Sequence, residues 1–400
     1  MSVLLSASSD YMFSKRTEWK LTPNRFSQAQ ADLRASGMEV LDISLSNPTR
    51  AGFQLDQEAI LQALAQPEAL DYDPQPKGLL SARQAVARYY HDAHGVYGVD
   101  PESLILTTST SEGYSYVFRL LCNPGDEILV PKPSYPLFEF LADLQDVTLI
   151  PYLLIYDAGW QIDFPSLYKA VNHRTRAVVV VHPNNPTGSY TSREEADGLN
   201  RFCSEYNLAL IVDEVFLDYA IDGAPRNSFI SNESALTFTL SGISKISGLP
   251  QMKVAWVGVS GAKQVKQQAL DRMDVIADTY LSMNAPLQLA TPVLLQQRRN
   301  LQPLLLDRIR SNVQELDRQL ARQKTCERLQ VDGGWNVVLR VPALQSDEDL
   351  AIDLLRKVAV LVHPGHFYDF PSDGYLVLSL ITPPEVVREG VNRILAVLND

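Results

Sequence analysis

Short apolar runs alternate with stretches of helical spacing along the first 240 residues. Runs of strand length fall at 41–45, 103–107, 127–130, 148–154, 177–181, 208–212 and 236–240. Helical spacing of apolar residues is found at 79–94, 112–122, 138–144 and 193–206. The run 177–181 is apolar throughout, which is typical of a strand buried on both faces. This alternation predicts an α/β fold whose large domain, residues 56–284, contains a doubly wound, mostly parallel sheet.

The pattern changes after residue 284. A long charged helix is predicted at about 301–323, and shorter strand-like and helical stretches follow it at 337–341, 347–358, 360–363 and 375–380, with a last helix at the end of the chain. These elements predict a second, smaller α+β domain.

Composition and charge narrow the possible partners. The chain has 400 residues and a net charge of -12, which argues against nonspecific binding to nucleic acid or to an anionic membrane. Met1–Asp10 has no charged leader, and no apolar stretch approaches the roughly 18 residues of a membrane span. Cys122, Cys203 and Cys326 are widely spaced, which fits core residues in a reducing compartment rather than metal ligands. We therefore expect a cytoplasmic protein without a metal site.

Polar residues follow the ends of several predicted strands, where the sheets of such folds bind their ligands. The first group is Thr108–Glu112, in which Ser109 and Glu112 have the spacing of a capping box. A helix that starts among hydroxyl groups can bind a phosphate, although the same residues can serve as a plain N-cap.

Three more groups follow later strands. Prolines bracket Asn184 and Asn185 in the segment 182–188, which holds an amide at the sheet edge or forms only a turn. Asp213 comes directly after the apolar run 208–212, and a buried carboxylate there needs a partner such as a pyridinium nitrogen, a helix N-terminus or a salt bridge. Lys245, in a turn of small residues, either forms an imine with an aldehyde cofactor or is solvated.

Taken together and in this order, the four groups resemble the class I/II aminotransferases. These are aspartate-aminotransferase-like enzymes of fold-type I, which depend on pyridoxal 5'-phosphate (PLP). The resemblance implies that Lys245 carries PLP as a Schiff base and moves the substrate's proton. It also implies that Asp213 keeps the ring nitrogen protonated, that Asn185 donates to the ring's O3′ and contacts substrate, and that Tyr135 stacks on the ring.

The resemblance also implies a phosphate site and a dimer. The expected phosphate-binding residues are Ser109, Thr110, Ser111 and Lys253, and Ser244 is expected to bind the cofactor. Tyr72 matches a tyrosine that reaches the phosphate of the neighbouring subunit, so a homodimer with shared active sites is expected. The small domain of the family combines both chain ends, here residues 1–55 and 285–400.

Four positions depart from the family's usual pattern. Lys253 stands where the family usually has an arginine that forms two hydrogen bonds to the phosphate. Lysine keeps the positive charge but not this bidentate geometry. Phe216 replaces a tyrosine that donates to O3′, which predicts a higher pKa for the Schiff base. Val377 replaces the arginine that clamps the substrate's α-carboxylate. In the loop 46–50 a usual glycine is absent, and Arg50 either supplies the missing positive charge to the substrate or is solvated.

His363 and His366 follow a strand near the place where the small domain closes over substrate. They either contact the substrate or act as a pH-dependent gate, unless they are ordinary structural histidines.

These features predict a PLP-dependent aminotransferase that moves an amino group between an amino donor and a 2-oxo acid through a pyridoxamine form. A PLP-dependent lyase, decarboxylase or racemase of the same fold is the alternative, because the sequence does not reveal which bond of the substrate stands perpendicular to the ring. A third reading is a degenerate binding protein, against which the retention of Lys245, Asp213 and Asn185 argues.

Overall fold

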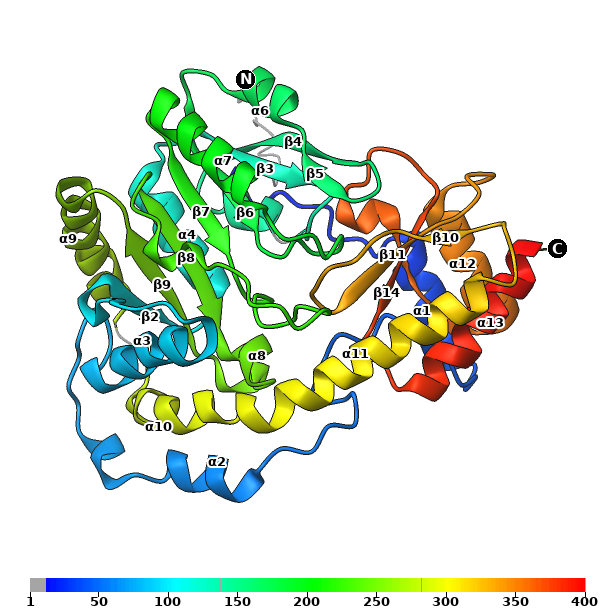
Figure 1. Ribbon diagram of the computed structural model, residues 1–400, viewed down its shortest axis with the longest axis horizontal. Helices are drawn as coiled ribbons and strands as arrows, with labels where there is room; N and C mark the ends of the chain where they lie inside the picture. The colour runs from blue at the N-terminus through cyan, green and yellow to red at the C-terminus, as the bar shows by residue number, and fades with distance from the viewer. Residues whose placement is uncertain (1–11, 137, 282, 400) are drawn as a thin grey trace, which may run out of the picture.

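Two large β-sheets and their helices organise the chain in the computed structural model, which describes residues 12–136, 138–281 and 283–399 (Figure 1). The expectation about Met1–Asp10 concerns a segment outside these residues. Within the described ranges, no helix is long and apolar enough to cross a membrane.

The larger sheet has eight strands in the order β2-β9-β8-β7-β6-β3-β4-β5. Their bounds are β2 (Leu104–Thr107), β3 (Glu127–Lys132), β4 (Thr148–Tyr156), β5 (Trp160–Ile162), β6 (Thr175–Val181), β7 (Ala209–Asp213), β8 (Thr237–Gly242) and β9 (Ala255–Ser260). The five central strands from β8 to β4 are parallel, while β9 and β5 run antiparallel to their neighbours. The predicted α/β fold with a doubly wound, mostly parallel sheet is therefore confirmed.

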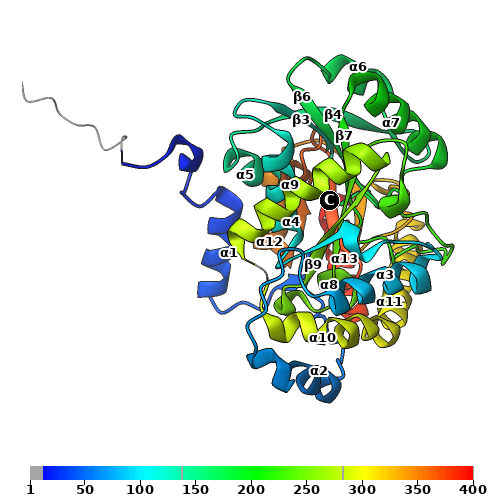
Figure 2. The ribbon, with the colours of Figure 1, turned by 90° about the vertical axis from the view of Figure 1, so that its left-hand side faces the viewer.

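Helices cover both faces of this sheet. They are α2 (Gln57–Leu64), α3 (Leu80–His94), α4 (Thr110–Leu121), α5 (Phe138–Asp143), α6 (Phe164–Ala170), α7 (Arg193–Tyr206), α8 (Ile243–Ile246), α9 (Lys263–Tyr280) and α10 (Ala285–Gln296). Successive residues of β6 point to opposite faces, so Val179 packs in one core with α4 and α9, and Val178 packs in another with α6 and α7. Figure 2 shows these two groups of helices on either side of the strands.

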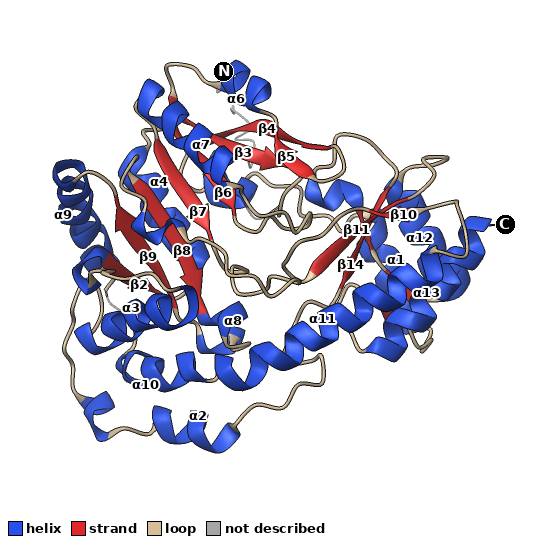
Figure 3. Ribbon diagram, in the orientation of Figure 1, coloured by secondary structure: helices blue, strands red, loops and turns tan. Residues whose placement is uncertain are grey.

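The second sheet is antiparallel and has the strand order β10-β11-β14-β13. Its strands are β10 (Glu327–Arg328), β11 (Asn336–Arg340), β13 (His363–Pro364) and β14 (Tyr375–Ser379), and Figure 3 shows β11 and β14 beside the larger sheet. Helices α1 (Arg25–Ala35), α11 (Arg298–Leu320), α12 (Asp347–Val358) and α13 (Pro384–Asn399) share a core with it. The parallel pair β1 (Leu41–Asp42) and β12 (Val360–Leu361) joins the N-terminal part of the chain to this unit.

Some predicted elements were wrong in extent. The strand predicted at 41–45 ends at Asp42, because the Asp42 carboxylate accepts a hydrogen bond of 2.9 Å from the Ser44 N–H and turns the chain. The run at 360–363 is divided between β12 and β13. Helix α7 and helix α12 have the predicted bounds.

The strands that carry the candidate chemistry end at one edge of the larger sheet. Val181, Asp213 and Gly242 are the last residues of β6, β7 and β8, and the register pairs Val181 with Asp213. Helix α4 begins at Thr110, three residues beyond Thr107, the last residue of strand β2. The carboxyl ends of parallel strands thus gather the predicted residues at one place.

Candidate functional site

A cavity of about 340 Å³ lies at this edge, between the larger sheet and the second one. Its lining residues are Ser46, Thr108, Ser109, Thr110, Tyr114, Tyr135, Phe138, Val181, Asn185, Asp213, Val215, Phe216, Gly242, Ser244, Lys245, Lys253, Ala255, Asn336, His363 and Tyr368. The volume suits a small molecule, since ligand pockets usually measure roughly 300–1,000 Å³.

Lys245 lies in the short helix α8, directly after β8. Its Nζ is 4.9 Å from the ring centroid of Trp335 and 5.4 Å from that of Phe216. Burial lowers the pKa of Lys245 to about 8, and the negative charge of Asp213 opposes this shift. A large fraction of the amine is therefore neutral near pH 8, the form that attacks an aldehyde.

Asp213 is a buried carboxylate held by two neutral donors. The Tyr114 hydroxyl donates to Oδ2 at 3.1 Å, and the Val215 N–H donates to Oδ1 at 3.1 Å. Burial raises the pKa of Asp213 to about 6, although both donors and Lys245 oppose the shift. A cation bonded to this carboxylate would relieve the cost of burying it, and a protonated ring nitrogen is such a cation.

The start of helix α4 forms another side of the cavity. The Ser109 side chain caps the helix by accepting from the Glu112 N–H at 3.1 Å. The Glu112 carboxylate instead accepts from the Thr108 N–H at 2.6 Å, so the capping box predicted from the spacing is not reciprocal. The first N–H groups of a helix lack partners within the helix and attract anions, and Lys253 adds a positive charge to the same cavity.

Asn185 and Asn336 link the two sheets at the cavity. The Asn336 Nδ2 donates to the Asn185 Oδ1 at 2.7 Å. The amide N–H₂ of Asn185 is then the part of that side chain with hydrogen-bonding capacity left for a ligand.

The second sheet contributes His363 and the 3₁₀ turn after it contributes Tyr368. The Nδ1 of His363 lies 3.0 Å from the Tyr368 hydroxyl, and burial lowers the pKa of His363. Val377, the position of the expected arginine, is paired with His363 in the sheet register and is 1% exposed. His366 is exposed and does not line the cavity.

Most of the residues predicted for the site line this cavity, but three do not. Ser111 is half-buried in the first turn of α4, outside the lining. Arg50 is exposed and does not line the cavity, whereas Ser46 of the same loop does. Tyr72 is 80% exposed and does not line the cavity of its own chain.

Sequence reasoning missed three polar residues of the cavity. Tyr114 lies one helical turn after Thr110, so the helical period would have brought it to the same face. Asn336 is a polar residue at the start of an apolar strand. Tyr368 carried no local signal, because its contact with His363 depends on the turn between β13 and β14.

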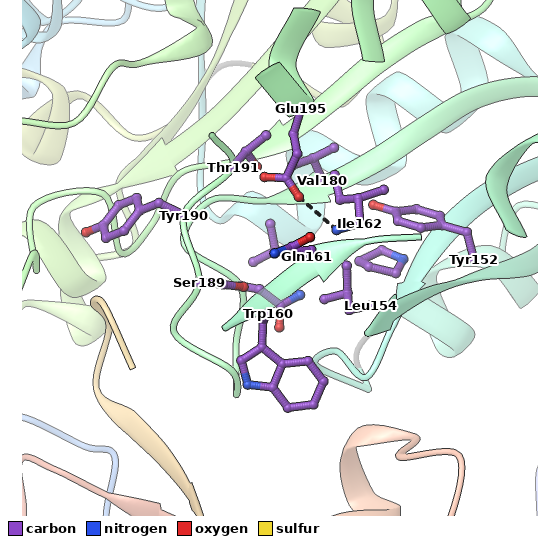
Figure 4. Close-up of a pocket in the computed structure, with 13 residues that line it drawn as sticks. Tyr152, Leu154, Trp160, Gln161, Ile162, Val180, Ser189, Tyr190, Thr191 and Glu195 are labelled. Carbon is purple, nitrogen blue, oxygen red and sulfur yellow. Dashed lines mark hydrogen bonds between the residues drawn. The ribbon is translucent and has the colours of Figure 1, made fainter. Parts of the chain in front are cut away.

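A second cavity, drawn in Figure 4, is too small to compete for a cofactor. It measures about 20 Å³ and is lined by residues of β4, β5, β6 and the segment 184–195, where the Ile162 N–H donates to Glu195 at 2.8 Å. That volume holds about one water molecule. The 340 Å³ cavity is the candidate active site because it brings together Lys245, Asp213 and the start of α4.

Comparison with known proteins identifies the class of enzyme. The family model for aminotransferases of class I and II matches residues 72–394. An alanine aminotransferase from Mycobacterium bovis is 30% identical over 370 residues, covering 89% of this chain and 84% of the relative. The glutamate-pyruvate aminotransferase AlaA from Haemophilus influenzae is 27% identical over 379 residues, covering 92% and 93%. The solved structure of an alanine aminotransferase from Pyrococcus furiosus has the same fold, with a TM-score of 0.87 at 21% identity over 97% of this chain and 99% of that one.

The chain belongs to the class I and II aminotransferases. The resemblance predicted from the four polar groups is therefore confirmed, as is the prediction of an enzyme that catalyses PLP-dependent transamination. The lyase, decarboxylase and racemase readings are not favoured, and neither is a binding protein without activity.

Proposed function

We propose that the 340 Å³ cavity binds PLP and transfers an amino group between an amino donor and a 2-oxo acid, with Lys245 as the residue that holds the cofactor. One observation carries this proposal. The Lys245 amine, whose pKa burial lowers to about 8, shares a cavity with the buried Asp213 carboxylate and with the start of helix α4. These three features match the aldehyde, the ring nitrogen and the phosphate of PLP, so the residues present fit the cofactor.

Asp213 and Tyr114 would serve the ring nitrogen. PLP supplies an electron sink for a substrate carbanion when its ring nitrogen is protonated. The Asp213 carboxylate would hold that proton, and the Tyr114 hydroxyl would keep the carboxylate in place through its hydrogen bond of 3.1 Å. After substrate displaces it from the cofactor, the Lys245 amine would take the proton from the amino-bearing carbon and return it to the cofactor's C4′.

The remaining lining residues would hold the cofactor in position. We assign the phosphate to Ser109, Thr110, Ser244 and Lys253, with Ser111 contributing through the backbone of the helix start. The amide of Asn185 would donate to O3′ and contact substrate, and the exposed side of the ring would be covered by Tyr135.

The protein would act as a homodimer. Leu70 and Tyr72 are 90% and 80% exposed, and Leu61 and Leu281 are also large exposed apolar residues. A second copy would bury such groups, and Tyr72 would then be free to reach the partner's phosphate. Analytical ultracentrifugation of the wild-type protein and of Leu70→Lys tests this, because the variant should sediment as a smaller species if Leu70 lies in the interface.

We propose two domains close to those predicted, 56–284 and 1–55 with 285–400. One shift is needed, because α10 packs in one core with α2 and α3 and so belongs with the large domain. Three free cysteines support the proposed cytoplasmic location.

The relatives' names support a small 2-oxo acid, such as pyruvate, as one of the two substrates. The experiment that tests the function is the visible absorption spectrum of the protein with PLP, followed by addition of amino donors. A band that forms with PLP and bleaches with a donor supports the proposal. Lys245→Ala should lack the band, whereas Lys253→Ala, as a matched control, should keep it with weaker cofactor binding. A band of equal intensity in Lys245→Ala would show that another residue holds PLP.

A further inference from the structure

One face of the second sheet forms a wall of the cavity. Residues paired in register share a face, so Val338, Val377 and His363 lie side by side across β11, β14 and β13. Asn336 lies two residues before Val338 and therefore on the same face. Asn336 and His363 line the cavity, while Tyr368 packs on Val338 and Val377.

The polar groups of this wall already have hydrogen-bond partners within the chain. Asn336 Nδ2 donates to Asn185, which leaves its Oδ1 as an acceptor and its second N–H as a donor. His363 Nδ1 faces the Tyr368 hydroxyl at 3.0 Å. If the hydroxyl donates to Nδ1, the proton of the neutral imidazole is on Nε2, which is then a hydrogen-bond donor. The wall thus offers both a donor and an acceptor, and both are uncharged.

The charged groups of the cavity have other uses. Among the described lining residues, Lys245 and Lys253 are the cations, and the proposed function assigns one to the cofactor aldehyde and the other to the phosphate. Asp213 is assigned to the ring nitrogen, and the charge of Asp42 opposes the lowering of the His363 pKa by burial. At the arginine's usual position, Val377 is buried beneath Tyr368. On the wall that the second sheet of this chain forms, His363 and Asn336 are therefore the groups that can recognise the group beside the amino-bearing carbon.

Resting on the proposed function, we propose that His363 and Asn336 determine specificity for an amino donor whose carboxyl group is uncharged, as in an amino-acid amide. An amide offers a carbonyl oxygen to the Nε2 of His363 and an N–H to the Oδ1 of Asn336. A free carboxylate offers only acceptors, and it loses its hydration here without a guanidinium in return. Tyr368 is a positioning residue, because it acts through the orientation of His363. The 2-oxo acid of the second half-reaction meets the same wall, so its carboxylate is bound by the donors of the wall alone and more weakly than an amide would be.

The test compares amino acids with their own amides. The PLP-loaded enzyme is mixed with alanine, leucine and phenylalanine and with the amide of each, and kcat/KM of the half-reaction is measured from the bleaching of the cofactor band. We expect the amide of the best pair to be preferred by about tenfold or more, because a site built for one hydrogen-bonding pattern rejects another. Binding of 2-aminoisobutyrate and of its amide, which lack the proton to be removed, is followed by the change in cofactor absorption and should give the same order.

Variants separate the wall from the rest of the site. His363→Gln and Asn336→Leu should each lower the preference for the amide by about tenfold, while an unchanged cofactor band reports that the site is folded. Tyr368→Phe should reduce the same preference without changing the band. His366→Gln, on the same turn but outside the cavity, is the matched control and should leave the preference unaltered.

Equal use of both compounds, or a preference for the free amino acid, overturns this inference and leaves the proposed function intact. Failure of any band to form with PLP overturns both. A preference for the amide that survives His363→Gln and Asn336→Leu also overturns the assignment to this wall.

Discussion

The two sides of the active-site cavity differ in charge and in how they are built. The side of the larger sheet contributes Asp213, which ends β7, Lys245 in α8 after β8, and Lys253, which follows the turn Pro250–Met252. The second sheet contributes Asn336 and His363, which hydrogen-bond to other neutral side chains. The first side therefore carries the charged groups of the site, and the second carries uncharged hydrogen-bonding groups around the buried Val377.

This difference separates the chemistry of the site from its specificity. The groups of the larger sheet match the aldehyde, the ring nitrogen and the phosphate of PLP. These parts of the cofactor are the same for every substrate, so the groups that bind them need not change with the substrate. The second sheet faces the part of the cavity that remains for substrate, where a change of side chain alters the choice of substrate without altering the reaction. Removing a charged group of the larger sheet should thus stop or strongly slow catalysis. Substitutions that keep the charge, or that add a hydroxyl beside it, should change rates and affinities only modestly.

The largest effect is expected from Asp213→Asn. An amide cannot hold the proton of the ring nitrogen as a carboxylate does, so the half-reaction should slow by about 10² to 10⁴-fold. The rate is measured from single-turnover bleaching of the cofactor band, which should still form because Lys245 is intact. A loss smaller than threefold would mean that Asp213 does not serve the ring nitrogen.

The next effect concerns the pH at which PLP enters the apo-protein. Because burial lowers the pKa of Lys245 to about 8, the amine is mostly protonated below pH 8 and mostly neutral above it. The rate of band formation should rise about tenfold per pH unit below pH 8 and level off above it, whereas an unshifted lysine would continue to about pH 10.4. A stopped-flow series from pH 6 to 10 measures this, and a rate that still climbs between pH 9 and 10 contradicts it.

Much of the fold was predictable because its signals are local. Helix α7 has the predicted bounds since Ser192 and Glu195 form a reciprocal capping box and Asn207 ends the helix in the left-handed region. Strand β9 was missed, because its short apolar run contains Gly258, a residue type that is depleted in strands. Its place between β2 and β8 depends on long-range pairing that a single stretch of sequence does not display.

The site was predictable on one side and much less so on the other. Lys245 and Asp213 follow apolar strands directly, and their position in the chain places them at the sheet edge. Tyr114 and Asn336 act through contacts with residues 99 and 151 positions away. Such contacts depend on how a helix and a second sheet pack against the first. The helical period indicates only which face of α4 carries Tyr114, and no local signal indicates the partner of Tyr114 or of Asn336.

A smaller effect should come from Phe216→Tyr, which restores the family's usual residue. The ring of Phe216 lies 5.4 Å from the Lys245 Nζ, so a hydroxyl on it would approach the cofactor's O3′. The hydroxyl would donate a hydrogen bond to O3′ and stabilise the deprotonated Schiff base. The pKa of the Schiff base should therefore fall by about one unit. A pH titration of the absorption band measures this, and an unchanged pKa in the variant would mean that the hydroxyl does not reach O3′.

The smallest effect is expected from Lys253→Arg, which also restores the usual residue. Lysine binds a phosphate as a point charge, whereas arginine presents two parallel donors, so the dissociation constant of PLP should fall by about three- to tenfold. The left-handed backbone at Lys253, with φ of 51°, is equally available to both residues, so the change isolates the side chain. Fluorescence titration of the apo-protein measures the constant. Lys77→Arg, at a lysine paired with Glu102 outside the cavity, is the control and should leave it unchanged. If Lys253→Arg binds PLP no more tightly than the wild type, Lys253 acts only through its charge. The replacement of arginine by lysine at this position would then not weaken the binding of PLP.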